Sequence, residues 1–276
     1  HGYTSELDST LFYGNITPVN KDRKLAITIN TYGEDVESVG YKIRSLEDKS
    51  LIENTEVSGY QVTDNKINVT LNIKNLLDTG KEYALEVVLK TKKHDAVYYY
   101  TRIMYGTDYD LQKKLDFVRD FNACTFDSAR LKDIGGYLET SSVGDNTNYG
   151  KVNINCSLSQ IGWGDLEPYI ESEITPEIIS INDDVAIIRL DYRVGAANDY
   201  SSSDTYNVNE YYRIRQTNSG FYLLNFEREM NQVFDAKNDL TSSAKINLGI
   251  NSSTYVNCTS DEKGIYTYFV NQGSLW

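Results

Sequence analysis

The feature that most constrains this chain is a series of short segments, between residues 23 and 105, with an apolar residue at every second position. The clearest is KINVTLNI, in which Ile67, Val69, Leu71 and Ile73 alternate with polar residues. A period of two places one face of a strand in a core and the other in water. Similar segments lie at 25–29, 41–43, 83–89 and 97–103. No helical pattern interrupts them, so residues 1–106 are predicted to form an antiparallel β-sandwich.

One stretch of this region carries a further signal, because LLDTGKEY places Leu77, Gly80 and Tyr83 at the entrance to a strand. This spacing resembles the tyrosine corner of immunoglobulin-like and fibronectin type III sandwiches. The resemblance implies that the phenol of Tyr83 hydrogen-bonds the backbone upstream. The Cys-Trp-Cys core of antibody domains is absent, so the resemblance is to the looser sandwich class.

The pattern changes near residue 107. Thr107 and Asp110 form an approximate capping box, and an apolar stripe follows, which predicts a helix over residues 109–123. A weaker helix is expected at 128–138 and a loop at 140–149. The stripe consists of Leu111, Leu115, Phe117, Val118 and Phe121.

Strands are predicted again farther along the chain. Residues 208–215 and 221–230 flank the turn TNSG and are expected to pair as a hairpin, with one face on the helix. Alternation places Tyr212 and Arg213 on opposite faces of the first strand, and it places Phe226 and Arg228 on the same face of the second strand as Tyr222. Further strands are predicted at 152–159, 178–181 and 185–192, with a turn at 182–184 and a loop at 194–205.

The hairpin segment NEYYRIRQTNSGFYLLNFEREM (209–230) resembles the long final strands of NTF2-like folds, and a cystatin-like sheet would look similar. The resemblance implies an α+β domain over residues 107–236, with a curved antiparallel sheet packed on a helix. Residues 237–276 are expected to be a β segment, with strands at 244–250 and 265–270, that leads into a further domain. Its end resembles the first strands of repetitive bacterial surface domains such as β-propellers. The predicted fold class is mainly β.

Composition restricts the partners of the chain. The net charge of −13 argues against nucleic acid, which requires clustered Lys and Arg, and against adsorption to an anionic membrane surface. No apolar run approaches the ~20 residues of a membrane span. The chain begins His-Gly and has 23 tyrosines but 3 prolines. We therefore expect an extracellular domain cut from a longer bacterial surface protein, anchored to the membrane by a removed N-terminal segment.

Motifs for catalysis, cofactors and metals are missing from the sequence. It contains no P-loop, no dinucleotide-binding fingerprint and no nucleophile elbow. His1 and His94 are too few for a histidine-based metal cluster, and His94 is interpreted as a solvated turn residue. Cys124, Cys156 and Cys258 lack zinc-site spacing. Buried free thiols are expected, with one disulfide and a leftover thiol as the alternative. We predict no catalytic residue, no cofactor and no metal.

An acidic stretch after Trp163 gives the competing hypothesis. Two carboxylates flanking a sugar are the requirement of a glycosidase, and Trp163 and Tyr169 are available to stack on that sugar. A solvated acidic loop is the simpler interpretation. The acidic residues are Asp165, Glu167, Glu171 and Glu173.

The aromatic strands offer the better candidate for ligand binding, because a curved sheet with aromatic and a few polar side chains forms a concave surface. The alternative is that these residues fill the domain's own core, and this filled version is favoured. The leading interpretation is a non-catalytic extracellular binding or scaffolding module that contacts cell-wall carbohydrate or another surface protein. A carbohydrate-active enzyme and a sensing ectodomain are the alternatives. The candidate ligand-binding residues are Trp163, Tyr169, Tyr192, Tyr211, Arg213 and Tyr222.

Overall fold

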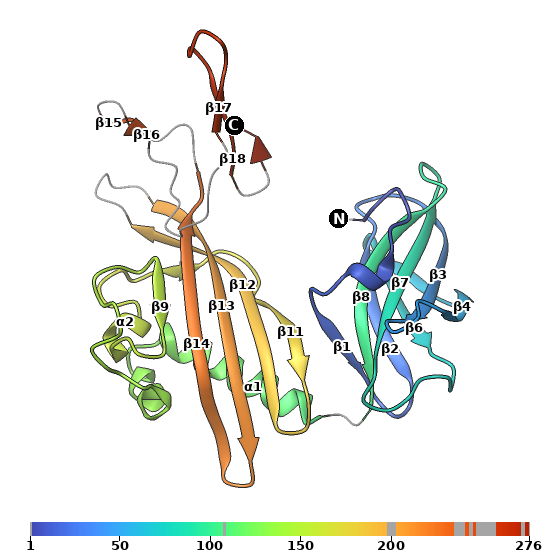
Figure 1. The fold of residues 1–276 in the computed structure, drawn as a ribbon, viewed down its shortest axis with the longest axis horizontal. Coiled ribbons are helices and arrows are strands. Elements are labelled where there is room, and N and C mark those ends of the chain that lie inside the picture. Colours follow the sequence, from blue (N-terminus) through green and yellow to red (C-terminus); the bar gives the residue numbers. More distant parts are fainter. Residues whose placement is uncertain are drawn as a thin grey trace. The chain divides into compact units, whose positions relative to one another are not determined.

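The protein is described by a computed structural model and is mainly β, as predicted. The structure describes residues 2–106, 109–197, 203–234, 241–242, 245–246, 258–271 and 274–275. Contacts divide the chain into two units. The first comprises residues 1–111 and 178–183, and the second comprises residues 112–177 and 184–276. The ribbon in Figure 1 labels their elements.

Two sheets form the first unit. In the five-stranded sheet, β1 pairs in parallel with β8 and the other neighbours are antiparallel, in the order β1-β8-β7-β3-β4. The three-stranded sheet has the order β2-β6-β5. A 3₁₀ helix, η1 (Ser9–Leu11), precedes them. The strands are β1 (Ile16–Val19), β2 (Lys24–Asn30), β3 (Val36–Ser45), β4 (Leu51–Val57), β5 (Gln61–Thr63), β6 (Lys66–Asn72), β7 (Glu82–Thr91) and β8 (Val97–Tyr105).

The core of this unit lies between the two sheets. On β6 burial alternates at every position, and Ile67 and Leu71 are completely buried against side chains of the other sheet such as Ile43 and Leu85. The alternation in the sequence therefore predicted the inward face of this strand correctly. When one face of a strand is in water, its apolar residues lie on the other, buried face.

Tyr83 makes the contact that its sequence context implied. Its ring is 5% exposed, and its hydroxyl accepts a hydrogen bond of 2.8 Å from the backbone N–H of Asp78. Gly80 adopts a φ of +77° in the connecting turn, and its N–H donates to the carbonyl of Tyr105 at 2.7 Å. Glycine is suited to this left-handed conformation. The tyrosine thus fixes the path of the chain into β7.

Replacing Tyr83 with Phe should lower the free energy of unfolding of the first unit by about 1 kcal/mol, because the N–H of Asp78 loses its acceptor. Chemical denaturation of the full chain would measure the change. Tyr32→Phe is the matched control, since Tyr32 is 80% exposed and its hydroxyl makes no hydrogen bond within the described residues. Equal midpoints for the two variants would remove the proposed role of Tyr83.

The second unit contains a long antiparallel sheet with the order β10-β12-β13-β14-β9, and β11 pairs with β12 outside this order. The α1 helix lies against one face, on the far side of the sheet in Figure 1. The strands are β9 (Lys151–Asn153), β10 (Tyr169–Ile170), β11 (Thr175–Ile181), β12 (Val185–Ala197), β13 (Ser203–Thr217) and β14 (Gly220–Gln232). The helices are α1 (Leu111–Thr125), the 3₁₀ helix η2 (Leu131–Tyr137) and α2 (Leu158–Ile161).

The predicted hairpin is confirmed, because β13 pairs antiparallel with β14 and the turn ends at Gly220. The helix also packs on it, although its contact face is rotated from the predicted one. Phe121 contacts the rings of Tyr212 and Phe226, with centroids 5.6 and 5.4 Å away. Leu111 and Leu115 are half-buried, whereas the buried positions are Lys114, Val118, Phe121, Asn122, Cys124 and Thr125. Of the predicted capping box, Thr107 lies outside the described residues, and Asp110 precedes α1 with a φ of +49°.

A β-bulge corrects the predicted orientation of β14. The register pairs Ile214 with Leu223 but Arg213 with Asn225, so Leu224 is the extra residue. An extra residue reverses the side that every later side chain faces. Phe226 and Arg228 therefore point toward α1, together with Leu223, and the prediction that they share a face with Tyr222 is wrong.

Three other predicted elements differ from the structure. The weaker helix is the 3₁₀ helix η2, because Gly135-Gly136 disfavours an α-helix. The strand expected at 152–159 ends at Asn153, and Ser157 caps the short α2 by accepting the N–H of Gln160 at 3.2 Å. The loop expected at 194–205 is shorter, because β12 continues to Ala197 and β13 begins at Ser203.

Toward the C-terminus the described residues form short strands, which appear in orange-red in Figure 1. The strand expected at 265–270 is present as β18, which begins at Thr267. The strand expected at 244–250 overlaps β16, whereas residues 244 and 247–250 lie outside the described part. The boundaries at 106 and 236 stay predictions. The strands are β15 (Thr241–Ser242), β16 (Lys245–Ile246), β17 (Cys258–Ser260), β18 (Thr267–Asn271) and β19 (Ser274–Leu275).

Candidate functional site

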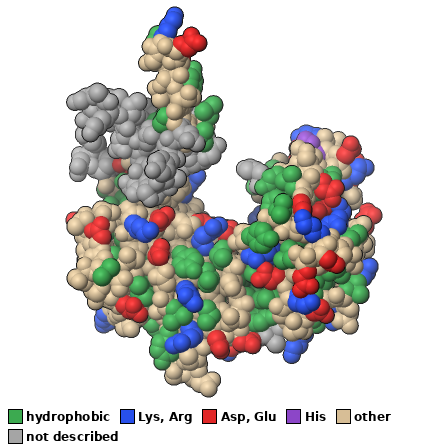
Figure 2. Space-filling view, viewed as in Figure 1, with side chains coloured by type: hydrophobic (Ala, Val, Ile, Leu, Met, Phe, Trp, Pro, Cys, Tyr) green, Lys and Arg blue, Asp and Glu red, His purple; other side chains and the backbone are tan. Residues whose placement is uncertain are grey.

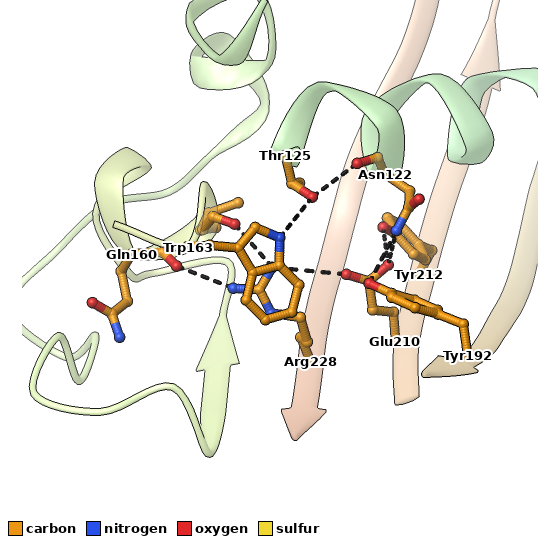
Figure 3. Close-up of polar contacts among 9 residues, drawn as sticks. Asn122, Thr125, Gln160, Trp163, Tyr192, Glu210, Tyr212 and Arg228 are labelled. Carbon is orange, nitrogen blue, oxygen red and sulfur yellow. Dashed lines mark hydrogen bonds and ion pairs between the residues drawn. The ribbon is translucent and has the colours of Figure 1, made fainter. Parts of the chain in front are cut away.

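A closed polar cluster lies between the sheet and α1 in the second unit (Figure 3). At its centre the guanidinium of Arg228, on β14, is completely buried. Its Nη1 and Nη2 donate to the carbonyls of Ile161 and Gln160, at 2.9 and 3.0 Å. The guanidinium carbon lies 3.4 Å from the ring centroid of Trp163. The arginine thus ties β14 to the segment around α2.

Glu210, on β13, supplies the negative charge of this cluster. It is also completely buried, and its Oε1 lies 3.8 Å from Nη1 of Arg228. Its other oxygen, Oε2, accepts hydrogen bonds from Asn122 Nδ2 at 2.8 Å and from the hydroxyl of Tyr212 at 2.7 Å. Asn122 also donates to the hydroxyl of Tyr192 at 3.2 Å. Helix α1 is therefore fixed to β12 and β13 by hydrogen bonds as well as by aromatic packing.

Trp163 covers the arginine from the loop after α2. It has a φ of +67°, which is unfavourable for a side chain of this size. Its indole N–H donates to Oγ1 of Thr125 at 3.3 Å. The flanking glycines permit this position, because a Cβ on Gly162 would lie 2.3 Å from Leu131, and a Cβ on Gly164 would lie 2.1 Å from the Tyr149 hydroxyl. The Gly-Trp-Gly motif is thus explained by close packing.

Burial shifts the pKa values of the charged and phenolic groups in this cluster. Desolvation raises the pKa of Tyr192 and of Tyr212 well above the usual value, and the negative charge of Glu210 raises both further. Desolvation lowers the pKa of Arg228, which the charge of Glu210 opposes. These shifts follow from a site closed to water, in which neutral phenols are favoured.

The closed cluster occupies the space between the sheet and α1. Its side chains, from Arg228 at 0% to Gln160 at 7%, are all buried. Two of the six candidate ligand residues, Trp163 and Tyr192, belong to it and are 1% and 5% exposed. The space between the sheet and α1 is therefore filled by the unit's own side chains, in agreement with the favoured version of the sequence interpretation.

A solvent-facing hollow of about 320 Å³ lies beside Trp163, in the region considered for a glycosidase. Of the four acidic residues there, Glu167 lines the hollow. Asp165 instead accepts a hydrogen bond from Tyr149 at 3.0 Å, and Glu171 accepts one from Thr205 at 3.0 Å. The hollow thus presents one of these carboxylates, whereas glycoside hydrolysis generally uses two that face each other.

The opposite side of the sheet is termed here the outer face, meaning the side of β12, β13 and β14 turned away from α1. Figure 2 shows it toward the viewer, with basic, acidic and hydrophobic side chains interspersed. The strand register sets these side chains in rows across the three strands. From one end the rows are Arg193-Asn207-Asn231, Asp191-Asn209-Glu229, Arg189-Tyr211-Glu227, Ile187-Arg213-Asn225 and Val185-Arg215-Tyr222.

Most charged groups on the outer face are paired. Arg189 forms ion pairs with Glu177 and with Asp191, the latter at 2.9 Å. Lys151 lies 3.6 Å from Glu229, and Asn225 donates to Glu227 at 3.1 Å. At the end nearer Arg193, a groove of about 360 Å³ is lined by residues that include Asp191, Asn207 and Asn231.

Tyr211 and Arg213 differ from these neighbours, because neither side chain has a hydrogen bond or an ion pair within the described part of the chain. Arg215 has no such partner there either, but its guanidinium carbon lies 5.5 Å from the ring centroid of Tyr222. Tyr222 is 47% exposed. The structure thus brings three of the six candidate residues, Tyr211, Arg213 and Tyr222, onto one surface.

Tyr169, the sixth candidate residue, is separate from both groups. It is 50% exposed on β10 and lies over Gly195, where an added Cβ would come 2.3 Å from its ring. Sequence reasoning missed Glu210, Arg228 and Asn122 as a cluster. The apolar residues Leu223 and Phe226 are three positions apart, whereas a regular strand repeats every two. This spacing was a signal for the bulge that turns Arg228 inward.

Comparison with models of known protein families finds no match to this chain, and no curated protein is significantly similar to it. No helix in the described part of the chain is long and apolar enough to cross a membrane. Within the described residues, no group of three or more His, Cys, Asp and Glu side chains could hold a metal ion. All three cysteines are free, with Cys124 and Cys156 buried and Cys258 exposed.

The Arg228–Glu210 pair should show strong energetic coupling. Glu210→Gln leaves a buried cation without its counter-charge, and Arg228→Met leaves a buried anion, so each variant should lose ~3 kcal/mol. The loss of unfolding free energy in the double variant should be smaller than the sum of the two single losses by at least ~1 kcal/mol. Denaturant titrations of the four proteins in the cycle measure this difference. Additive losses would contradict the pairing.

The buried tyrosines should make the second unit sensitive to alkali. Their folded pKa values lie above the unfolded value of about 10, so the unfolded chain releases protons first, and stability is lost as the pH rises above ~10. Tyr212→Phe should make this decline shallower by about 1.4 kcal/mol per pH unit. Denaturation curves at successive alkaline pH values test it, with the exposed Tyr222→Phe as the control. An unchanged slope for Tyr212→Phe would contradict the shift.

Proposed function

We propose that the second unit is a non-catalytic carbohydrate-binding module whose ligand lies on the outer face of its sheet. The observation that carries this proposal is the group of unpaired side chains in the middle of that face. Tyr211 and Arg213 have no polar partner within the described residues, and no described helix covers them (Figure 1). Tyr211 is half-buried and Arg213 is exposed, and the nearby Tyr222 is 47% exposed. Aromatic and unpaired basic groups beside one another on a surface are typical of a contact with a partner.

The chemistry of the face favours a carbohydrate. Tyr211 and Tyr222 offer flat apolar rings with a polar tip, which suit the apolar face of a sugar ring. Asn209 and Asn225 lie in the neighbouring rows. Their amide nitrogens donate to Asp191 and Glu227, and their amide oxygens can accept hydrogen bonds from sugar hydroxyls. An open sheet surface with these groups fits an extended chain of sugars better than a small ligand, which needs an enclosing pocket.

Two features of the interior support a role other than catalysis. The pKa values of Tyr192 and Tyr212 are raised well above the usual value, but their hydroxyls are hydrogen-bonded to Asn122 and Glu210 in a closed cluster. The hollow near Trp163 carries one of the four carboxylates considered for a glycosidase. An extracellular, cell-surface setting remains part of this proposal and is supported by the composition.

Affinity electrophoresis of the full chain through gels that contain neutral or acidic polysaccharides tests the proposal. At least one polysaccharide should retard the protein. Tyr211→Ala should weaken that binding about tenfold, which corresponds to ~1.4 kcal/mol, because the sugar loses its contact with the ring. Tyr222→Ala should act in the same direction.

Tyr32→Ala serves as the control, since it removes an exposed tyrosine from the first unit. It should bind as the unaltered protein does. Retention of full affinity in both Tyr211→Ala and Tyr222→Ala would place the ligand elsewhere and contradict the proposed surface.

A further inference from the structure

We infer that the outer face binds a polysaccharide that carries carboxylate groups, an inference that rests on the binding function proposed above. The first argument is charge. The chain has 40 acidic and 27 basic residues, so most arginines have acidic groups available as partners. Arg213 and Arg215 nevertheless form no ion pair within the described residues. Two guanidinium groups are thus left to bind an anion from outside.

The other basic groups of this surface have polar partners. Arg189 and Lys151 are paired with Asp191 and Glu229, and Arg193 donates to the amide oxygen of Asn207 at 3.1 Å. Glu227, one row from Arg213, accepts its hydrogen bond from Asn225. Arg213 and Arg215 therefore stand out on this face as guanidinium groups without a hydrogen bond or ion pair within the described residues, although the chain as a whole is strongly negative.

Geometry supports a chain of carboxylated sugars as the occupant. Arg213 and Arg215 are two positions apart on β13, so they project from the same face about 7 Å apart. Each guanidinium presents a planar fork that binds a carboxylate through two hydrogen bonds. Tyr222 lies across from Arg215, with its ring beside the guanidinium, and Tyr211 is two positions before Arg213. A uronic acid residue combines the two matching groups, an apolar ring face and a carboxylate.

Other polyanions fit less well. A nucleic acid carries a charged phosphate at every nucleotide and needs many clustered basic contacts, whereas this part of the outer face offers two unpaired arginines. An acidic polypeptide would satisfy the arginines but would lack rigid rings for Tyr211 and Tyr222. The carboxylate and the sugar ring should therefore both be required, and this requirement can be tested with matched polymers.

The experiment compares three probes with the full chain: polygalacturonate, the same polymer with its carboxylates methyl-esterified, and poly-L-glutamate. Polygalacturonate should bind tightest. Arg213→Gln combined with Arg215→Gln should weaken this binding about 30-fold, from the loss of charge-assisted hydrogen bonds. Esterification should weaken binding by a similar factor, and added salt should weaken the binding of polygalacturonate.

Lys132→Gln combined with Arg119→Gln is the control, because it makes the same change in net charge. Arg119 is exposed on α1 and Lys132 is exposed on η2, so neither belongs to the outer face. This control should retain the affinity of the unaltered protein. An equal loss in the control would show a non-specific charge effect and would overturn the inference.

The outcomes separate this inference from the proposed function. If the esterified polymer or poly-L-glutamate bound as tightly as polygalacturonate, the inference of a carboxylated polysaccharide would be overturned. If the esterified polymer binds equally and Tyr211→Ala abolishes that binding, the binding function stands without the acidic ligand. If no polysaccharide of the neutral and acidic series binds, both proposals fail.

Discussion

The second unit depends on the contact between the Arg228 guanidinium, the Glu210 carboxylate and the Trp163 indole. Burying two opposite charges costs several kcal/mol, which is offset where additional hydrogen bonds satisfy the groups. Arg228 donates to two carbonyls of the α2 segment, and Glu210 accepts from Asn122 and Tyr212. The pair therefore holds α1, the α2 segment and the central strands in one arrangement. Removing either charge would leave the other buried and unpaired.

The bulge at Leu224 determines on which side of the sheet this cluster forms. Without the extra residue, Arg228 would share the outer face with Tyr222, and Phe226 would leave the aromatic core that it forms with Phe121 and Tyr212. The two faces of the sheet consequently have different chemistry. The face on α1 is aromatic and closed, whereas the outer face carries ladders of Arg, Asn, Asp, Glu and Tyr that meet solvent.

The sequence predicted the parts of this protein in which each strand has one dry and one wet face. The inward face of β6, the contact of Tyr83, the β13–β14 hairpin and the helix that packs on it followed from periodicity and turn chemistry. The buried cluster did not, because polar residues in a strand are normally assigned to the wet side. Trp163 and Tyr192, two of the candidate ligand-binding residues, are buried in this cluster. Tyr211 and Arg213 lie on one face of β13, as alternation predicted, and the strand register brings Tyr222 to the same face.

The central claim is that the second unit keeps its interior filled and uses the outer face to bind. Mapping a bound oligogalacturonate by NMR chemical-shift changes would test this most directly. The account predicts that the changes centre on Tyr211, Arg213, Arg215 and Tyr222, and that the indole N–H of Trp163 stays unaffected. Changes centred on Trp163, Asn122 and the buried side of the sheet would show that the ligand enters between the sheet and α1, which would contradict the account.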